Sequence, residues 1–263
     1  MIRRNVPLGD HADGVPHDWL LVSQIEHARL SHVLASAWQG ILPAAAEATR
    51  DEFLAAVLHH DDGWEDWRTA PKLDPEHGRP YGFTEMPPAE GQAIWAKSID
   101  ACCAIGPLAG WVVASHFIQL QSKRDDDFPE WAKWLGEQDR RRAGWFEAWQ
   151  SQHPANTAAV AEECLHLLRE FDWLSLWLCC RAPIDARDPV DALELGDGSH
   201  GFGPFLLTPK GPVIKVDPWP FTAPAIDLVV NAERCPAGVY RSASELNAVT
   251  TRAAWRLAPA TGT

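Results

Sequence analysis

Residues 157–180 read TAAVAEECLHLLREFDWLSLWLCC, and this stretch predicts a long helix with one aspartate, Asp172, inside an otherwise apolar run. A carboxylate at the centre of a buried helix costs several kcal/mol unless it is paired, hydrogen-bonded or bound to a metal. An arginine, the N-terminus of another helix or a metal ion would each satisfy Asp172. The stretch therefore predicts a core helix and a partner for its aspartate.

Apolar residues at three- and four-residue steps predict five further helices, at 23–38, 47–60, 93–105, 108–121 and 128–152. A turn is expected at 125–127. Between 67 and 92, proline and glycine punctuate an irregular segment. Short strands are expected at 2–5 with 19–22, at 205–208 with 213–216, and at 226–231, with a frayed tail after Leu257. These patterns predict a mainly α fold: a single domain over 1–263, with a helical core at about 20–180 and a small β-rich region at about 200–245.

Composition narrows the class of function. The 263 residues include 36 acidic and 23 basic ones, for a formal net charge of −13. The electrostatic field of such a negatively charged protein repels phosphate backbones, so we expect no nucleic-acid partner. No apolar stretch reaches the roughly 20 residues that cross a bilayer, and we expect no membrane partner and no secretory signal. The six cysteines include no C-x-x-C pair and suit buried, reduced thiols, which favours the cytoplasm. The oligomeric state is left open.

Residue types that bind metals occur on four of the predicted helices. They are His27, the pair His60-Asp61, His116 and Asp172. Taken singly, His27, His116 and the pair His60-Asp61 are each more often a hydrogen-bonded core residue or a solvated helix end, whereas for Asp172 alone a structural partner and a functional role are equally expected. Together, imidazoles and carboxylates suit one or two divalent transition ions (Mn, Fe, Co, Ni or Zn) and leave positions open for water and substrate.

A histidine, then a His-Asp pair, then a distant aspartate is the order found in HD metal-dependent phosphohydrolases. Longer motifs strengthen the likeness: Gln24-x-x-His27, His60-Asp61-Asp62-Gly63-Trp64, Gly78-Arg79-Pro80, Ser115-His116, Asp172-x-Leu174-Ser175-Leu176 and Pro218-x-Pro220-Phe221. With these, the chain resembles an uncharacterised domain-of-unknown-function family (number 3891) related to the HD superfamily. The resemblance covers about 2–257. It implies an HD-like helical bundle with a small β-hairpin or sheet appendage from the N- and C-terminal segments, and a metal centre, but no known substrate.

Carried over residue by residue, the resemblance implies that His27, His60, Asp61 and Asp172 are the metal ligands. Asp62 and His116 are the candidates for proton transfer, and His116 is alternatively a ligand of a second ion.

For substrate binding, the candidates are Gln24, Trp64, Lys72 and Arg79. Lys72 and Arg79 would attract a small anionic molecule, in a segment from 72 to 83 that is a candidate lid. Its Tyr81 and Phe83, with Trp64 and Trp67, are candidates for an aromatic wall.

Three functions remain open on the sequence alone. The first is hydrolysis of a small phosphorylated metabolite or nucleotide by metal-activated water. The second is an HD-type di-iron oxygenase. The third is a non-catalytic protein that binds a metal or another ligand.

Overall fold

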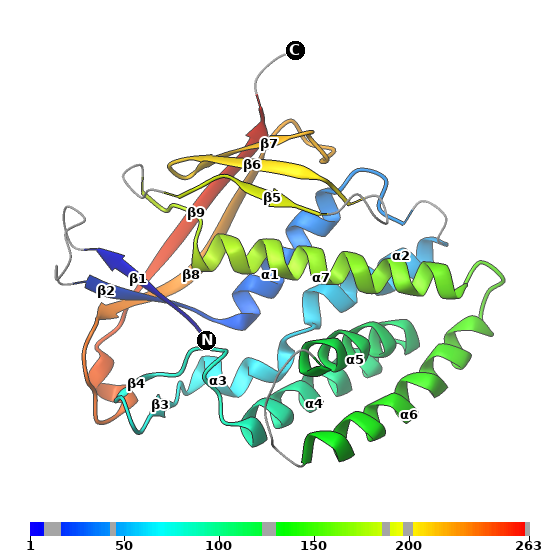
Figure 1. Ribbon diagram of the computed structural model, residues 1–263, viewed down its shortest axis with the longest axis horizontal. Helices are drawn as coiled ribbons and strands as arrows, with labels where there is room; N and C mark the ends of the chain where they lie inside the picture. Colours follow the sequence, from blue (N-terminus) through cyan, green and yellow to red (C-terminus); the bar gives the residue numbers. More distant parts are fainter. Residues whose placement is uncertain (8–16, 43–45, 123–129, 186–189, 197–201, 261–263) are drawn as a thin grey trace.

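The computed structural model describes residues 1–7, 17–42, 46–122, 130–185, 190–196 and 202–260. It is 51% helical and 23% strand, and its main sheet has seven strands curled into a half-barrel. The expected mainly α, HD-like bundle with a small β appendage is therefore wrong. The fold is mixed, and the sheet is a major part of it (Figure 1).

Within the described residues, seven α-helices follow one another along the chain. They are α1 (Gln24–Ala37), α2 (Glu47–His59), α3 (Glu65–Thr69), α4 (Pro88–Ile105), α5 (Pro107–Ser122), α6 (Glu130–Gln150) and α7 (Ala158–Cys180). The six helices expected from the sequence are confirmed, with α4 beginning five residues earlier than expected. The irregular segment contains α3 and two short strands, β3 (Leu73–Asp74) and β4 (Arg79–Pro80). The turn expected at 125–127 lies outside the described residues.

The main sheet takes strands from both ends of the chain. Its strands are β1 (Ile2–Pro7), β2 (His17–Val22), β5 (Leu193–Leu195), β6 (Phe205–Lys210), β7 (Val213–Asp217), β8 (Ile226–Pro236) and β9 (Val249–Pro259). Their spatial order is β1-β2-β8-β9-β7-β6-β5. Both expected hairpins form, and they are joined into one sheet by β8 and β9, because β2 pairs with β8, β8 with β9 and β9 with β7.

Strand β9 explains why the sheet is larger than the sequence predicted. It pairs antiparallel with β8 over nine residues and parallel with β7 over four. Its segment contains adjacent alanines and two arginines, which carry little strand propensity. Ala253, Trp255 and Leu257 nevertheless alternate inward, because strands on both sides supply backbone partners. The expected β-rich limits of 200–245 thus extend to 193–259, and the tail after Leu257 is strand as far as Pro259.

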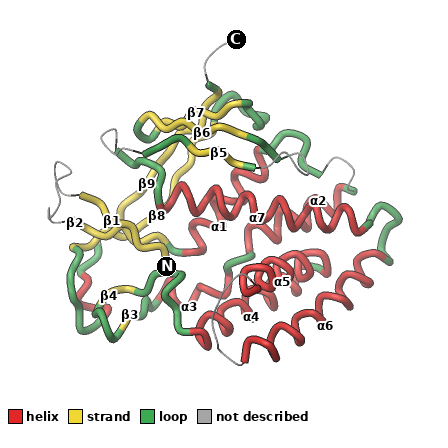
Figure 2. Tube along the Cα trace, viewed as in Figure 1, coloured by secondary structure: helices red, strands yellow, loops and turns green. Residues whose placement is uncertain are grey.

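Helices and strands occupy different sides of the molecule (Figure 2). Helices α1 and α7 contact the sheet and each other, while α2, α4 and α5 pack beyond them and α6 packs on α5. Trp38, just after α1, stacks on Phe202 at 4.5 Å and meets Phe171 of α7 edge-on. Its backbone also forms a bridge to Phe221. This aromatic contact joins the helices to the sheet.

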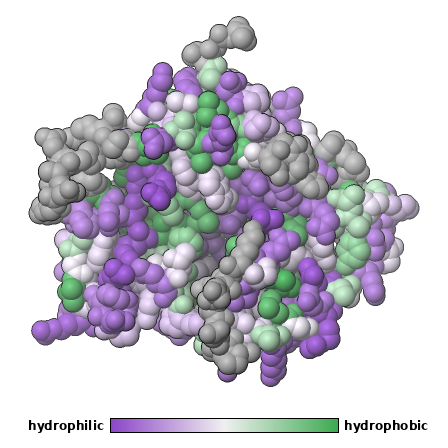
Figure 3. Space-filling model, viewed as in Figure 1, coloured by the Kyte–Doolittle hydropathy of each residue, from purple (hydrophilic) through white to green (hydrophobic). Residues whose placement is uncertain are grey.

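The surface is largely hydrophilic on the face shown in Figure 3. Apolar patches on this face are small and separated. Among the described residues, no helix combines the length and the apolar character needed to cross a membrane.

Gly63 is a test of the packing between the turn after α2 and helix α4. A Cβ at this position would lie 2.0 Å from the Ile94 carbonyl oxygen and 2.9 Å from the Ser98 nitrogen, both backbone atoms. We expect Gly63→Ala to lower the free energy of unfolding by at least about 2 kcal/mol, measured by urea denaturation.

Gly144, inside helix α6, is the control for the glycine-to-alanine change, because a Cβ there meets no atom within 4 Å. We expect Gly144→Ala to stabilise the protein by up to about 1 kcal/mol. Equal effects of the two substitutions would contradict the close approach at Gly63.

Candidate metal centre

His27 is positioned by the junction between β2 and α1. Ser23 follows β2 directly, and its side chain accepts a hydrogen bond from the Glu26 backbone nitrogen, capping the helix. Glu26 then accepts two hydrogen bonds from Asn231 of β8. These contacts hold the first turn of α1 on the sheet, and the next residue, His27, is fully buried and contacts Ser175 of α7.

His60 and Asp61 lie where α2 ends. The chain leaves the helix at His60 and enters a short 3₁₀ turn, Asp62–Trp64. The backbone nitrogen of Gly63 donates to Ser98 Oγ of α4 at 3.0 Å. Because Gly63 has no side chain, the turn lies against α4, and this contact fixes the direction of the His-Asp pair.

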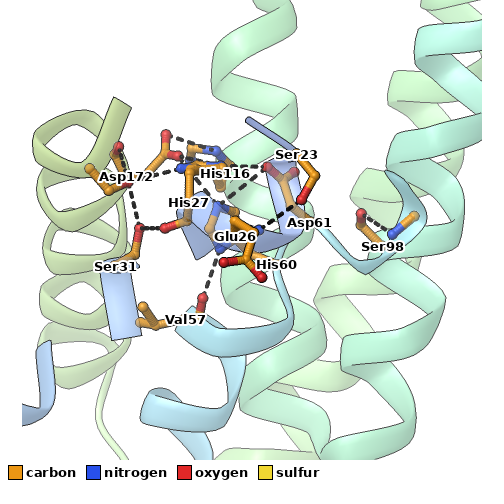
Figure 4. A network of polar contacts seen from close by, with 12 residues as sticks. Ser23, Glu26, His27, Ser31, Val57, His60, Asp61, Ser98, His116 and Asp172 are labelled. Atoms are coloured by element: carbon orange, nitrogen blue, oxygen red, sulfur yellow. Dashed lines mark hydrogen bonds and ion pairs between the residues drawn. The ribbon is translucent and has the colours of Figure 1, made fainter. Parts of the chain in front are cut away.

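The four expected ligands meet in one buried cluster (Figure 4). Ligand atoms of His27, His60 and Asp172 all lie within 4.8 Å of one another. Asp61 Oδ2 lies 2.7 Å from His27 Nε2 and 3.8 Å from His60 Nε2. Residues far apart in the chain thus bring two imidazoles and the Asp172 carboxylate together, with the Asp61 carboxylate beside the two imidazoles but outside the group whose ligand atoms all lie within 4.8 Å.

Hydrogen bonds on the far side of each ring set which nitrogen faces the cluster. His60 Nδ1 lies 2.8 Å from the Val57 carbonyl oxygen, which only accepts, so Nδ1 carries the hydrogen. Ser175 donates its hydroxyl hydrogen to the Asp172 carbonyl oxygen and therefore accepts from His27 Nδ1 at 2.8 Å. Both Nε2 atoms then face carboxylates, an arrangement that needs either added protons or a cation between them.

The pKa values follow from the same geometry. Burial lowers the pKa of His60, but the carboxylates of Asp61 and Asp172 outweigh burial and raise it to about 9. Burial raises the pKa of Asp172, yet the hydrogen bond from His60 and the nearby imidazoles hold it well below its ordinary value. The cluster therefore stabilises positive charge between its two carboxylates. Imidazole nitrogens and carboxylate oxygens are also suitable ligands for a divalent transition ion, so the residues fit one.

His116 of α5 lies beside the cluster but differs from its neighbours. Its Nε2 is 3.7 Å from Asp172 Oδ2, and its Nδ1 has no hydrogen-bond partner among the described residues. Burial lowers its pKa to about 4, so the ring is neutral at pH 7. It lines a cavity of about 360 Å³ that opens beside Asp61 and Asp172.

The family comparison can now be set beside this geometry. The model of a protein family of unknown function, DUF3891, matches residues 13–236. The chain belongs to this family. No curated protein and no solved structure matches it significantly. The matched range includes every residue of the cluster, and the function of the family is unknown.

The expected substrate-binding and proton-transfer residues divide into two groups. Gln24, Trp64 and His116 line the cavity beside the cluster. Asp62 does not: its carboxylate bonds His59 Nδ1 at 2.8 Å, and both side chains are partly exposed.

Lys72 and Arg79 are also absent from the described residues that line the cavity. Lys72 pairs with Glu90 at 2.8 Å and lies over the Trp67 ring, while Arg79 pairs with Glu85 at 3.0 Å. Of the expected aromatic wall, Phe83 joins Trp64 in lining the cavity, whereas Tyr81 packs on Trp67.

The sequence analysis missed the roles of Ser175, Trp95, Phe117 and Leu176. Ser175 follows Asp172 by three residues, so the helical period already placed both on one face of α7. The other three line the cavity, but their apolar character is equally expected of core residues. Only the packing of α4 on α5 and of α5 on α7 separates cavity wall from core.

We expect Ser175→Ala to weaken divalent-ion binding by roughly 10–100-fold, because His27 loses the acceptor that directs its Nε2 toward the carboxylates. Zinc titration by calorimetry measures the effect. Ser122→Ala, at the exposed end of α5, is the control. Unchanged affinity in Ser175→Ala would show that Ser175 does not orient His27.

We also expect a pH signature in the ion-free protein. The folded-state pKa of His60, about 9, lies above its ordinary 6.5. Its stabilisation is therefore complete below pH 6.5 and is lost as the pH rises through about 9. Thermal unfolding of chelator-treated protein between pH 6.5 and 9.5 should show this fall, and His60→Gln should lack it. Parallel profiles for the two proteins would contradict the assignment.

Proposed function

We propose that the protein is a metal-dependent hydrolase that cleaves a small phosphorylated molecule with activated water. The observation that carries the proposal is the buried group of His27, His60 and Asp172, whose ligand atoms lie within 4.8 Å of one another beside a cavity. Buried carboxylates held without arginine or lysine partners in the cluster favour a functional cation site over a structural ion pair.

The proposal also concerns which feature of the chain resembles the HD phosphohydrolases. We infer that it lies in the ligand set, with one histidine from α1, the His-Asp pair after α2 and the aspartate of α7, rather than in the overall architecture. Fold alone would not assign the chemistry, so the argument rests on the donor atoms and their surroundings.

In this proposal, different residues bind the metal ion and transfer the proton. His27 and His60 would offer Nε2 lone pairs, and Asp61 and Asp172 would offer carboxylate oxygens, to one divalent ion such as Mn, Fe, Co, Ni or Zn. When bound, such an ion lowers the pKa of water and polarises a phosphoryl oxygen. His116 lies beside Asp172 with a neutral ring facing the cavity, which suits it to orient a water molecule or pass a proton to the leaving oxygen. Asp62 bonds His59 instead, so we assign proton transfer to His116.

Elemental analysis tests the metal centre directly. We expect about one equivalent of a transition metal per wild-type chain, and its loss in His60→Ala and in Asp172→Ala, because each variant removes a ligand and leaves buried charge unpaired. His59→Ala is the matched control: this neighbouring histidine is partly exposed and bonds Asp62 rather than the cluster. Full metal content in His60→Ala would refute the ligand assignment.

Phosphate release then tests the reaction. Metal-loaded wild type should release phosphate from at least one small ester, and His116→Gln should lower kcat by about 100-fold with metal content unchanged. Iron with oxygen uptake and no phosphate release would instead support a di-iron oxygenase. Bound metal without either reaction would support a non-catalytic role.

A further inference from the structure

The cavity beside the metal ligands is strongly apolar for a site expected to act on a phosphate ester. At one end lie Asp61, Asp172 and His116. The remaining wall is mainly aromatic and aliphatic and comes from five segments of the fold: Trp64, Phe83, Trp95, Phe117, Leu120 and Leu176. At about 360 Å³, the cavity is near the lower end of the range of small-molecule sites, roughly 300–1,000 Å³.

Charge limits what the cavity can hold. No lysine or arginine is among the described residues that line it. Lys72 and Arg79, the two basic residues that the sequence suggested for substrate binding, are engaged with Glu90 and Glu85. A divalent ion would offset the two carboxylates and leave no further positive charge. The site therefore suits one phosphate group at the ion and disfavours di- and triphosphates, which rely on Lys or Arg contacts.

The apolar wall has the geometry of a ring-binding site. Trp95 of α4 and Phe117 of α5 stack with ring centroids 5.0 Å apart and planes inclined by 17°, and both rings line the cavity. Trp64 and Phe83 add two more aromatic side chains to the lining. Flat aromatic surfaces bind flat ligands by offset stacking and edge contacts.

One polar atom breaks this apolar wall. Gln24 is 5% exposed and lines the cavity, and its Oε1 has no hydrogen-bond partner among the described residues. A buried amide oxygen without a partner costs free energy, so its presence favours a ligand that donates a hydrogen bond there.

We propose that the site accepts a phosphate ester of a ring-bearing alcohol, with a single phosphate and an aromatic ring such as a phenyl group or a nucleobase. The ring lies against Trp95 and Phe117, and an N–H or O–H of the ligand donates to Gln24. This inference rests on the proposed hydrolase function of the same centre. In the reaction, water adds to phosphorus, the P–O bond to the ring-bearing alcohol breaks, and the alcohol takes up a proton from that water.

Binding of two non-hydrolysable probes tests the ring site. We expect metal-loaded full-length protein to bind phenylphosphonate at least about 10-fold more tightly than methylphosphonate in calorimetry, because only the phenyl group reaches the apolar wall. Equal affinities would overturn the proposal.

Two variants test whether the preference for the phenyl group arises from the cavity wall. Leu120→Ala and Phe83→Ala should each lower the phenyl-to-methyl affinity ratio by roughly 3–10-fold, since each removes apolar surface from the cavity. Val33→Ala is the matched control: Val33 is an aliphatic residue on α1 with 42% exposure, close to the 39% of Leu120, and it does not line the cavity. A ratio unchanged in both cavity variants would place the ring elsewhere and overturn the proposal.

Phosphate release from benzyl phosphate separates this inference from the proposed function. Aryl preference without hydrolysis would support the ring site and refute the hydrolase. Hydrolysis of ethyl phosphate as fast as of benzyl phosphate, with equal affinity for the two phosphonates, would support the hydrolase and refute the ring site.

Discussion

The compensation of two buried carboxylates is the constraint on which this structure depends. Asp61 and Asp172 come from different parts of the chain, and their charges are met by the Nε2 atoms of His27 and His60. Neither aspartate could stay buried if α1, α2 and α7 did not converge, because an isolated carboxylate in the core is far less stable than one in water. The polar centre thus specifies how these three helices pack.

Contacts around the imidazole rings fix the orientation of His27 and His60 in that centre. The Val57 carbonyl and the Ser175 hydroxyl each hold an Nδ1, so both Nε2 atoms face the carboxylates. The short hydrogen bond of Gly63 to Ser98 fixes the turn that carries Asp61. A ligand set arranged by its neighbours in this way costs little to reorganise when a cation enters.

The sheet and the outer helices have separate roles around this centre. Through Glu26, Asn231 and the aromatic contacts of Trp38, the half-barrel holds α1 and α7 in place. Helices α4 and α5 supply the stacked rings of the cavity wall. Helices α5 and α7 contribute to both parts, His116 and Asp172 to the polar cluster and Phe117 and Leu176 to the apolar wall, so the two parts share the same helices.

The sequence by itself determined the helices and the identity of the clustered residues. The 3.6-residue period marks the six longer helices but not α3, and an aspartate in an apolar run such as 171–177 signals a buried charge. Only the tertiary structure decided the rest. Strand β9 exists because β7 and β8 flank it, although its alanines and arginines carry no strand signal of their own. Lys72 and Arg79 lie off the cavity because nearby glutamates bind them, and Trp95 and Phe117 line it because α4 and α5 meet there. Pairing and packing between distant segments leave no local pattern, which is why the cavity could not be predicted from the sequence.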